Sequence, residues 1–171
     1  MKKIKKPYEL FDDFRKTTFK NCGDDGDYAI TVDSNEKIIY VSFEESDGKR
    51  DWYNNFAFFP IPIKPYKNMK KKWYAHRGFV RVYHSIRDSI FNDLNDLMFE
   101  LKDSEEYVIV ILGWSHGGAL AQLFYEDCVY REVERELILM TWGSPKPFYS
   151  KWKVKELLNE ENQFCYENGS D

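Results

Sequence analysis

The sequence predicts an α/β domain with a mostly parallel central sheet and flanking helices. Two runs, EYVIVIL at 106–112 and ELILMTW at 136–142, are apolar at successive positions, which is typical of strands covered on both faces in a parallel sheet. The residues between these runs have apolar side chains at helical spacing, and a long amphipathic stretch precedes the first run. Strands that alternate with helices in this way indicate an α/β layered sheet.

Length and composition fit a single domain, 1–171. Hydrophobic residues make up 43% of the chain and aromatic residues 18%, which is enough to form a packed core. The formal net charge of −4, with both signs mixed, gives no reason to expect a nucleic-acid partner. The apolar runs are too short for a transmembrane segment, and the start MKKIKKPYELFDDF has no apolar stretch of an export signal, so we expect a cytoplasmic protein.

The first predicted elements are a helix at 7–19 and two short strands. The strands, DYAITVDS and KIIYVSF, lie on either side of Ser34–Asn35–Glu36, which is a hairpin-like signal. The segment PIPIKP at 60–65 contains three prolines, and prolines disfavour both helices and interior strands. We therefore expect a surface loop there.

The longest predicted helix extends from Phe79 to about Leu101. It has one apolar stripe at spacings of three and four residues, formed by Tyr83, Ile86, Ile90, Leu94, Leu97 and Leu101. The strand, helix and strand that follow, within 106–142, form a βαβ unit. A helix at 151–159 and a short strand at 163–166 extend the alternation.

Cysteine usage gives no sign of a disulfide framework or a metal centre. Cys22, Cys128 and Cys165 are an odd number at wide spacing, without a CxxC pair. We expect all three to be packing residues. No cluster of ligating residues suggests a metal, and no cofactor is expected.

The residues with the clearest chemical potential form a G-x-S-x-G motif between the first buried strand and the helix after it. Gly113, Ser115 and Gly117 occupy its fixed positions. Glycines on either side allow a tight strand-to-helix turn, so that the serine takes a strained backbone position with an exposed hydroxyl. The helix N-terminus would stabilise negative charge that develops beside it. Ser115 is therefore the candidate nucleophile.

Four blocks in order resemble the fungal-type class 3 lipases of the α/β-hydrolase superfamily. They are VSFEESDGKRDW (41–52), AHRGFVRVY (75–83), VILGWSHGGALAQ (110–122) and MTWGSPKPF (140–148). They are similar to the family's FRGT-then-DW segment, its H-x-GF block, its nucleophile elbow and its FGSP block. The resemblance implies an ester hydrolase that uses a Ser-Asp-His triad and needs no cofactor.

Carried over by position, the resemblance implies roles for individual residues. Ser115 matches the nucleophile, the backbone N–H groups of His116 and Ser46 match the two oxyanion-hole donors, and Asp171 matches the acid of the triad. Glu44–Glu45 stands where the family usually has Arg-Gly, and a carboxylate beside the hole would repel an oxyanion.

The general base is not identified. The family's histidine lies well downstream of its aspartate, whereas the chain's three histidines, His76, His84 and His116, all precede Asp171. His76 matches the H-x-GF block and is expected to be structural, His84 is expected to be partly exposed, and the His116 side chain is expected to point away from the Ser115 hydroxyl. On this interpretation the chain is a fragment, cut before the catalytic histidine and lacking the last strands of the sheet.

Two functions follow from the resemblance. The first is a carboxylic ester hydrolase that acts on acylglycerols or related lipid esters through an acyl-serine, with transient contact to a lipid surface. The second is a catalytically incomplete lipase-like fold that binds lipid or protein, consistent with Glu44–Glu45 and the missing base. A serine peptidase or thioesterase is a third option that the GSP and H-x-GF blocks disfavour. Residues 54–72 are apolar enough to form a lid, or equally a packed surface loop.

Overall fold

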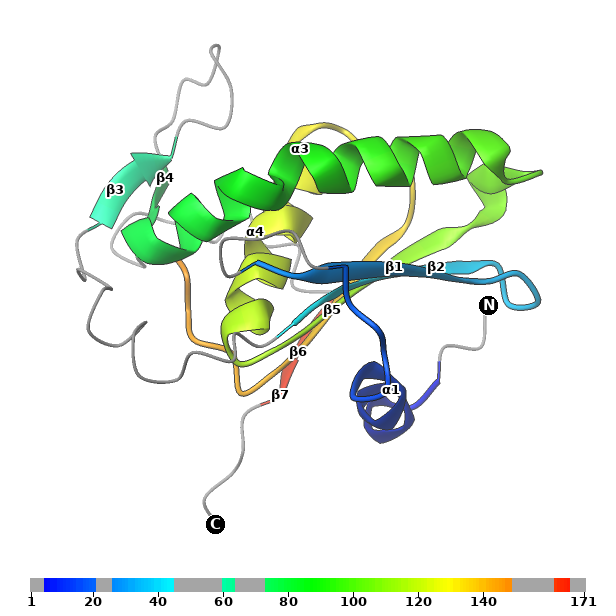
Figure 1. The fold of residues 1–171 in the computed structure, drawn as a ribbon, viewed down its shortest axis with the longest axis horizontal. Helices are drawn as coiled ribbons and strands as arrows, with labels where there is room; N and C mark the ends of the chain where they lie inside the picture. Colours follow the sequence, from blue (N-terminus) through cyan, green and yellow to red (C-terminus); the bar gives the residue numbers. More distant parts are fainter. Residues whose placement is uncertain (1–4, 21–25, 45–59, 64–72, 149–161, 167–171) are drawn as a thin grey trace.

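A five-stranded sheet lies at the centre of the molecule, with helices on both faces (Figure 1). The computed structural model describes residues 5–20, 26–44, 60–63, 73–148 and 162–166. The strand order is β1-β2-β5-β6-β7, and β1 pairs with β2 antiparallel while the other pairs are parallel. The predicted α/β class with a mostly parallel sheet is therefore confirmed. The strands are β1 (Tyr28–Asp33), β2 (Ile38–Phe43), β5 (Val108–Trp114), β6 (Leu137–Trp142) and β7 (Gln163–Tyr166).

The β1–β2 hairpin turns where the sequence predicts. The Asp33 carboxylate accepts hydrogen bonds from the backbone N–H groups of Asn35 and Glu36, each 3.1 Å long. An aspartate that bonds to N–H groups two and three residues later favours a turn. Lys37 takes a left-handed conformation with φ of 54° before β2 begins.

The central strand β5 is buried over its first six residues because β2 and β6 flank it and helices cover both of its faces. The strand is displaced by two residues from its predicted start, since Ser104–Glu106 form a short 3₁₀ helix, η1, after Asp103 at φ of 55°. The β-branched run of the sequence therefore occupies the most enclosed place in the sheet, as its composition indicates.

The larger core lies between the sheet and two helices, α3 (Arg77–Glu100) and α4 (His116–Tyr130). The predicted apolar stripe of α3 faces this core, where Tyr83, Ile86, Ile90 and Leu94 are buried. Leu97 and Leu101, near the end of the helix, are only partly buried. Both helices lie on the same side of the sheet in Figure 1, and most of the buried apolar side chains belong to this layer.

A buried charge network joins α3 to α4 inside this core. The Tyr83 hydroxyl donates to Asp127 Oδ2 at 2.6 Å, and Arg131 Nε donates to Asp127 Oδ1 at 3.2 Å. Arg87 Nε lies 3.6 Å from Asp127 Oδ2, and the Arg131 guanidinium stands 3.7 Å above the Phe91 ring centroid. The Asp127 side chain is only 3% exposed, and these partners offset the cost of burying its polar oxygens.

The other face of the sheet is covered by α1 (Pro7–Phe14), whose Leu10 and Phe14 pack on β2, β5 and β6. The prediction of a helix over 7–19 was too long. Thr17 and Thr18 follow the helix, and β-branched residues are poor helix formers. The Thr17 hydroxyl donates to the Asp13 carbonyl, and the Lys20 N–H donates to the Tyr28 carbonyl, so the chain leaves the helix toward β1.

A small second sheet corrects the loop predicted for PIPIKP. Pro60–Ile63 form β3, which pairs antiparallel with β4 (Trp73–His76) in the register Pro60 to His76. Residues two apart in a strand direct their backbone nitrogens to the same side, so the backbone nitrogens of Pro60 and Pro62 can both point away from β4. Pairing with β4 then needs no N–H donor from either proline, so the two prolines are compatible with a strand.

Two other expectations concern the C-terminal helix and the cysteines. The helix expected at 151–159 lies outside the described residues. Cys128 is buried, as expected of a packing residue, but Cys165 is exposed on β7, so the prediction was wrong for that residue. Its position explains the difference, because the described sheet ends at β7 and leaves Phe164, Cys165 and Tyr166 exposed. Cys22 lies outside the described residues.

Candidate active site

Ser115 occupies a tight turn between β5 and α4. Its backbone has φ of 52° and ψ of −122°, a conformation that residues other than glycine rarely adopt. The Ser115 N–H donates to the Trp142 carbonyl at 2.9 Å, and its own carbonyl accepts from the Gly118 N–H at 3.0 Å. These two bonds hold the strained residue at the carboxyl ends of β5 and β6.

The glycines of the motif are required by close backbone contacts. A Cβ at Gly113 would lie 2.4 Å from the Gly117 carbonyl oxygen. A Cβ at Gly117 would lie 2.3 Å from the carbonyl oxygen of Phe43 and 2.6 Å from that of Glu44. The end of β2 therefore packs directly against the first turn of α4. The structural context predicted for G-x-S-x-G, a strand followed by a helix, is confirmed.

The three histidines have different surroundings. His116, the first residue of α4, is 1% exposed and packs against Phe79 of α3, with ring centroids 5.4 Å apart. His76 also packs on Phe79, with ring centroids 4.9 Å apart, and burial lowers the pKa of its imidazole. His84 is exposed on α3. Within the described residues, no hydrogen bond joins an imidazole to the Ser115 hydroxyl, so the structure assigns the base to none of them.

The loop after β6 is hydrogen-bonded to α4, the helix that follows the Ser115 turn (the elbow, residues 113–117). Gln122 Nε2 of α4 donates to Ser144 Oγ at 2.7 Å, and the Gly143 N–H donates to the Tyr166 carbonyl at 2.8 Å. Gly143 has φ of 54°, a conformation suited to glycine. The sequence identifies the GSP block but gives no signal for Gln122, because that contact depends on how α4 lies against the loop.

Ser46 and Asp171, predicted as a second oxyanion donor and as the triad acid, lie outside the described residues. The strand that leads to Ser46 ends beside the elbow, since Glu44 is in contact with the position of Gly117. Of the predicted lid at 54–72, residues 60–63 are described and form β3, and the rest lies outside the described residues.

The described residues contain no group of three or more His, Cys, Asp or Glu side chains that could hold a metal ion. Among the helices described, none is both long and apolar enough to cross a membrane.

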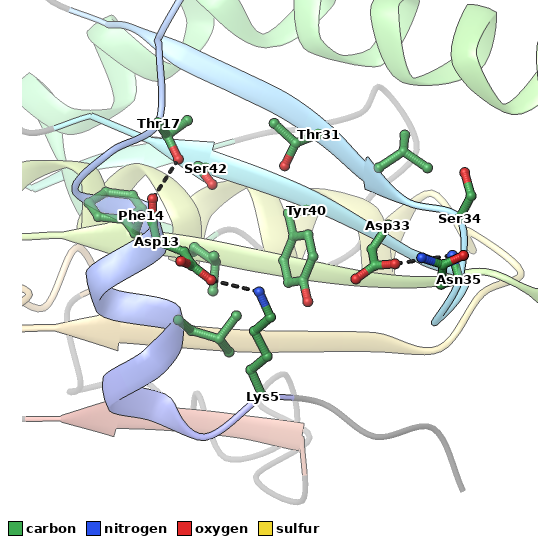
Figure 2. Close-up of a pocket in the computed structure, with 13 residues that line it drawn as sticks. Lys5, Asp13, Phe14, Thr17, Thr31, Asp33, Ser34, Asn35, Tyr40 and Ser42 are labelled. Carbon is green, nitrogen blue, oxygen red and sulfur yellow. Dashed lines mark hydrogen bonds and ion pairs between the residues drawn. The ribbon is translucent and has the colours of Figure 1, made fainter.

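A separate hollow of about 340 Å³ lies on the α1 face, between α1 and the β1–β2 hairpin (Figure 2). Lys5 reaches into it and forms an ion pair with Asp13 at 2.7 Å, while Tyr40 stands in its centre and Asp33 at its far end. Ser115 does not line it. This hollow is therefore distinct from the turn that holds Ser115.

The sequence and structure match known lipases. The family model described as lipase (class 3) matches residues 40–168. The protein LIH1 of Saccharomyces cerevisiae is 27% identical over 154 residues, which cover 81% of this chain and 45% of LIH1. The lipase of Rhizomucor miehei is 30% identical over 114 residues, which cover 65% of this chain and 30% of the lipase. The chain thus spans less than half the length of these relatives.

Solved structures agree on the fold. The triacylglyceride lipase of Rhizomucor miehei superposes with a TM-score of 0.66 at 24% identity, covering 78% of this chain and 49% of the lipase. Lipase II from Rhizopus niveus gives a TM-score of 0.70 at 21% identity, covering 84% of this chain and 52% of that protein. Because the family model also covers most of the sequence, this chain belongs to the class 3 lipase family and has its α/β-hydrolase fold.

Proposed function

We propose that the protein hydrolyses carboxylic esters of lipids, with Ser115 as the nucleophile. The observation that carries the proposal is the left-handed Ser115 at the turn from a buried strand to a 15-residue helix. A serine costs stability in this conformation, and a turn of this kind exposes its hydroxyl at the positive end of the helix. Family membership supports lipid esters as the substrate class.

In the proposed reaction the Ser115 oxygen bonds to the ester carbonyl carbon while a base accepts the hydroxyl proton. The carbonyl oxygen becomes an oxyanion, and backbone N–H groups of His116 and Ser46 would stabilise it. Collapse of this intermediate breaks the ester C–O bond, and the alcohol leaves with the proton. Water then attacks the acyl-serine by the same route and releases the acid.

The remaining roles are assigned on the family resemblance. Asp171 would orient the imidazole that acts as the base. The described surroundings of His76, His84 and His116 provide no bond to Ser115, so none of these three histidines is assigned as the base. The Glu44 backbone lies beside Gly117 in the turn that follows Ser115. Acidic residues at 44 and 45, so close to the proposed oxyanion hole, are the main argument against efficient stabilisation of an oxyanion.

That feature supports a second candidate, a lipase-like protein that binds lipid without hydrolysing it. Glu44–Glu45 replaces the family's usual Arg-Gly, and loss of one oxyanion donor alone costs about a hundredfold to a thousandfold in rate. In this case Ser115 would retain its strained backbone but would form no acyl-enzyme. Transient contact with a lipid surface belongs to both candidates.

The test is hydrolysis of short-chain and long-chain p-nitrophenyl esters by the full-length protein that the gene encodes. Ser115→Ala is expected to lower kcat at least about a thousandfold, while Ser34→Ala, at the exposed hairpin turn, is the matched control and should leave activity unchanged. Hydrolysis that persists in Ser115→Ala would contradict the nucleophile assignment. A wild-type protein that is inactive yet binds lipid vesicles would support the second candidate.

A further inference from the structure

Helix α1 contacts the residues beside the Ser115 turn from the opposite face of the sheet, and two of these ring contacts are made by Phe11. We propose that Phe11 is a positioning residue, which holds Ser115 in its strained conformation by packing against both Trp114 and Trp142. The inference rests on the proposed function for its consequence in catalysis. The effect of Phe11 on the backbone of Ser115 does not depend on activity.

The first contact is with the residue directly before Ser115. The Phe11 ring lies edge-on to the Trp114 ring, with centroids 5.8 Å apart and an interplanar angle of 87°. This is a favourable arrangement for two aromatic rings. Trp114 is the last residue of β5, so its position fixes where the chain enters the turn.

The second contact is with the residue that hydrogen-bonds Ser115. The Phe11 ring lies 5.2 Å from the Trp142 ring, and the Trp142 carbonyl accepts the Ser115 N–H at 2.9 Å. Phe14 and Tyr166 also contact the Trp142 ring, at 6.1 Å and 6.2 Å. Phe11 thus contacts both tryptophans next to the nucleophile.

Helix α1 is itself fixed well enough to support such a role. Leu10 and Phe14 are buried against the sheet, and the Glu9 carboxylate accepts the Lys6 N–H at 3.0 Å in a capping interaction. The helix precedes residue 40, where the match to the family model begins, so this support comes from a segment that the family model does not cover.

Loss of the Phe11 ring would leave space beside two large, partly buried side chains. Trp114 and Trp142 could then shift toward the space, and the peptide group before Ser115 and the carbonyl that accepts its N–H would shift with them. Because a left-handed serine is held only by its surroundings, a looser turn spends less time in the reactive geometry. We therefore expect an effect on the rate of the chemical step rather than on substrate binding.

The experiment compares Phe11→Ala with Phe19→Ala in the full-length protein. Phe19 is a matched control because it packs on Phe14 at 5.6 Å and has no ring contact with either tryptophan among the described residues. Phe11→Ala should lower kcat about 10- to 100-fold with little change in KM, whereas Phe19→Ala should keep kcat. Phe11→Tyr, which retains the ring, should restore it.

Amide hydrogen exchange at Ser115, measured by NMR in the folded protein, gives the second readout. It should be about tenfold faster or more in Phe11→Ala than in wild type and Phe19→Ala. If Phe11→Ala does not fold, Phe11→Leu tests the same contact with less loss of volume. Equal exchange and equal kcat in the Phe11 and Phe19 variants would overturn the proposal. If the wild type hydrolyses no ester, the proposed function fails, and exchange at Ser115 still decides the role of Phe11.

Discussion

The two faces of the sheet are built very differently. On one face α3 and α4 enclose the larger core and the Asp127 charge network. On the other, α1 is the one helix that covers the sheet in the described part of the chain, and it leaves a hollow of about 340 Å³ beside Tyr40. Both faces nevertheless meet the elbow, through Phe79 at His116 on the first and through Phe11 at Trp114 on the second.

This difference indicates a division of roles. The α3/α4 face supplies most of the apolar burial, which is the main favourable contribution to folding. The α1 face buries less but contacts Trp114, which precedes Ser115, and Trp142, whose carbonyl accepts the Ser115 N–H. We expect substitutions on the first face to lower global stability strongly, and substitutions on the second to have smaller effects on stability.

The largest difference should appear when one core phenylalanine is removed from each face. Phe124 is fully buried and packs between Phe43 and Phe91 at 5.6 Å and 5.1 Å. Phe124→Ala should lower the free energy of unfolding by about 3–5 kcal/mol, because the cavity is enclosed on all sides. Phe14→Ala should cost less, since Phe14 already borders the hollow and α1 can settle into the space. Urea unfolding measures both, and an equal or larger loss in Phe14→Ala would contradict the comparison.

A second difference should separate the charged groups of the two faces. Asp127→Ala leaves Arg131 and Tyr83 without their carboxylate, and breaking a buried pair costs about 3–5 kcal/mol. The loss in the free energy of unfolding should lie at the lower end of this range, because the side chains of Arg131 and Arg87 are 29% and 22% exposed.

Asp13→Ala removes the ion pair with Lys5 on the α1 face, where both side chains are about half exposed. It should change stability by less than about 1 kcal/mol. Thermal unfolding of both variants checks the pair of predictions. A large loss in Asp13→Ala would show that α1 depends on this surface contact.

A further difference is one of pH, and it concerns Glu126 on α4. Its side chain is buried, and burial raises its pKa from 4.5 to about 8, although the Gln163 amide opposes the shift. The folded state therefore keeps this proton where the unfolded chain has lost it. The contribution of Glu126 to the free energy of unfolding is fully present below pH 4.5 and is lost as the pH rises through 8. Between these values the free energy of unfolding falls by up to about 1.4 kcal/mol per pH unit.

Glu126→Gln should therefore flatten the decline of stability between pH 5 and pH 8. Glu134→Gln, on the surface, is the control and should retain the wild-type profile. Urea unfolding at several pH values distinguishes them, and parallel profiles for wild type and Glu126→Gln would show that the carboxyl is not responsible.

The sequence could predict the parts of the fold that depend on local patterns. The apolar runs of β5 and β6, the stripe of α3 and the glycines around Ser115 each carry a period or motif within a short window. The same short window of sequence predicts the turn from β5 to α4. Ser46 and Asp171, which rest on the family resemblance, stay predictions.

The rest depends on contacts between distant segments, which no local pattern encodes. The three prolines at 60–65 predict a loop, and only pairing with β4 shows how two of them fit in a strand. Nothing in the sequence around Glu126 distinguishes it from a surface carboxylate on a helix. Similarly, the sequence predicts a helix over 7–19 but not that Phe11 contacts Trp114 and Trp142.

The strand order also has a consequence for the order of folding. β5 and β6 are joined by a single helix, and Ile109 pairs with Leu137. β2 and β5 are separated by a much longer segment of chain, since Ile38 pairs with Val108. Closing the longer loop costs more entropy, so we expect β5, α4 and β6 to associate first and the β1–β2 hairpin to dock later. The carbonyls of Phe43 and Glu44 would then reach Gly117 in a late step. Nascent chains would form the serine turn early and complete its surroundings last.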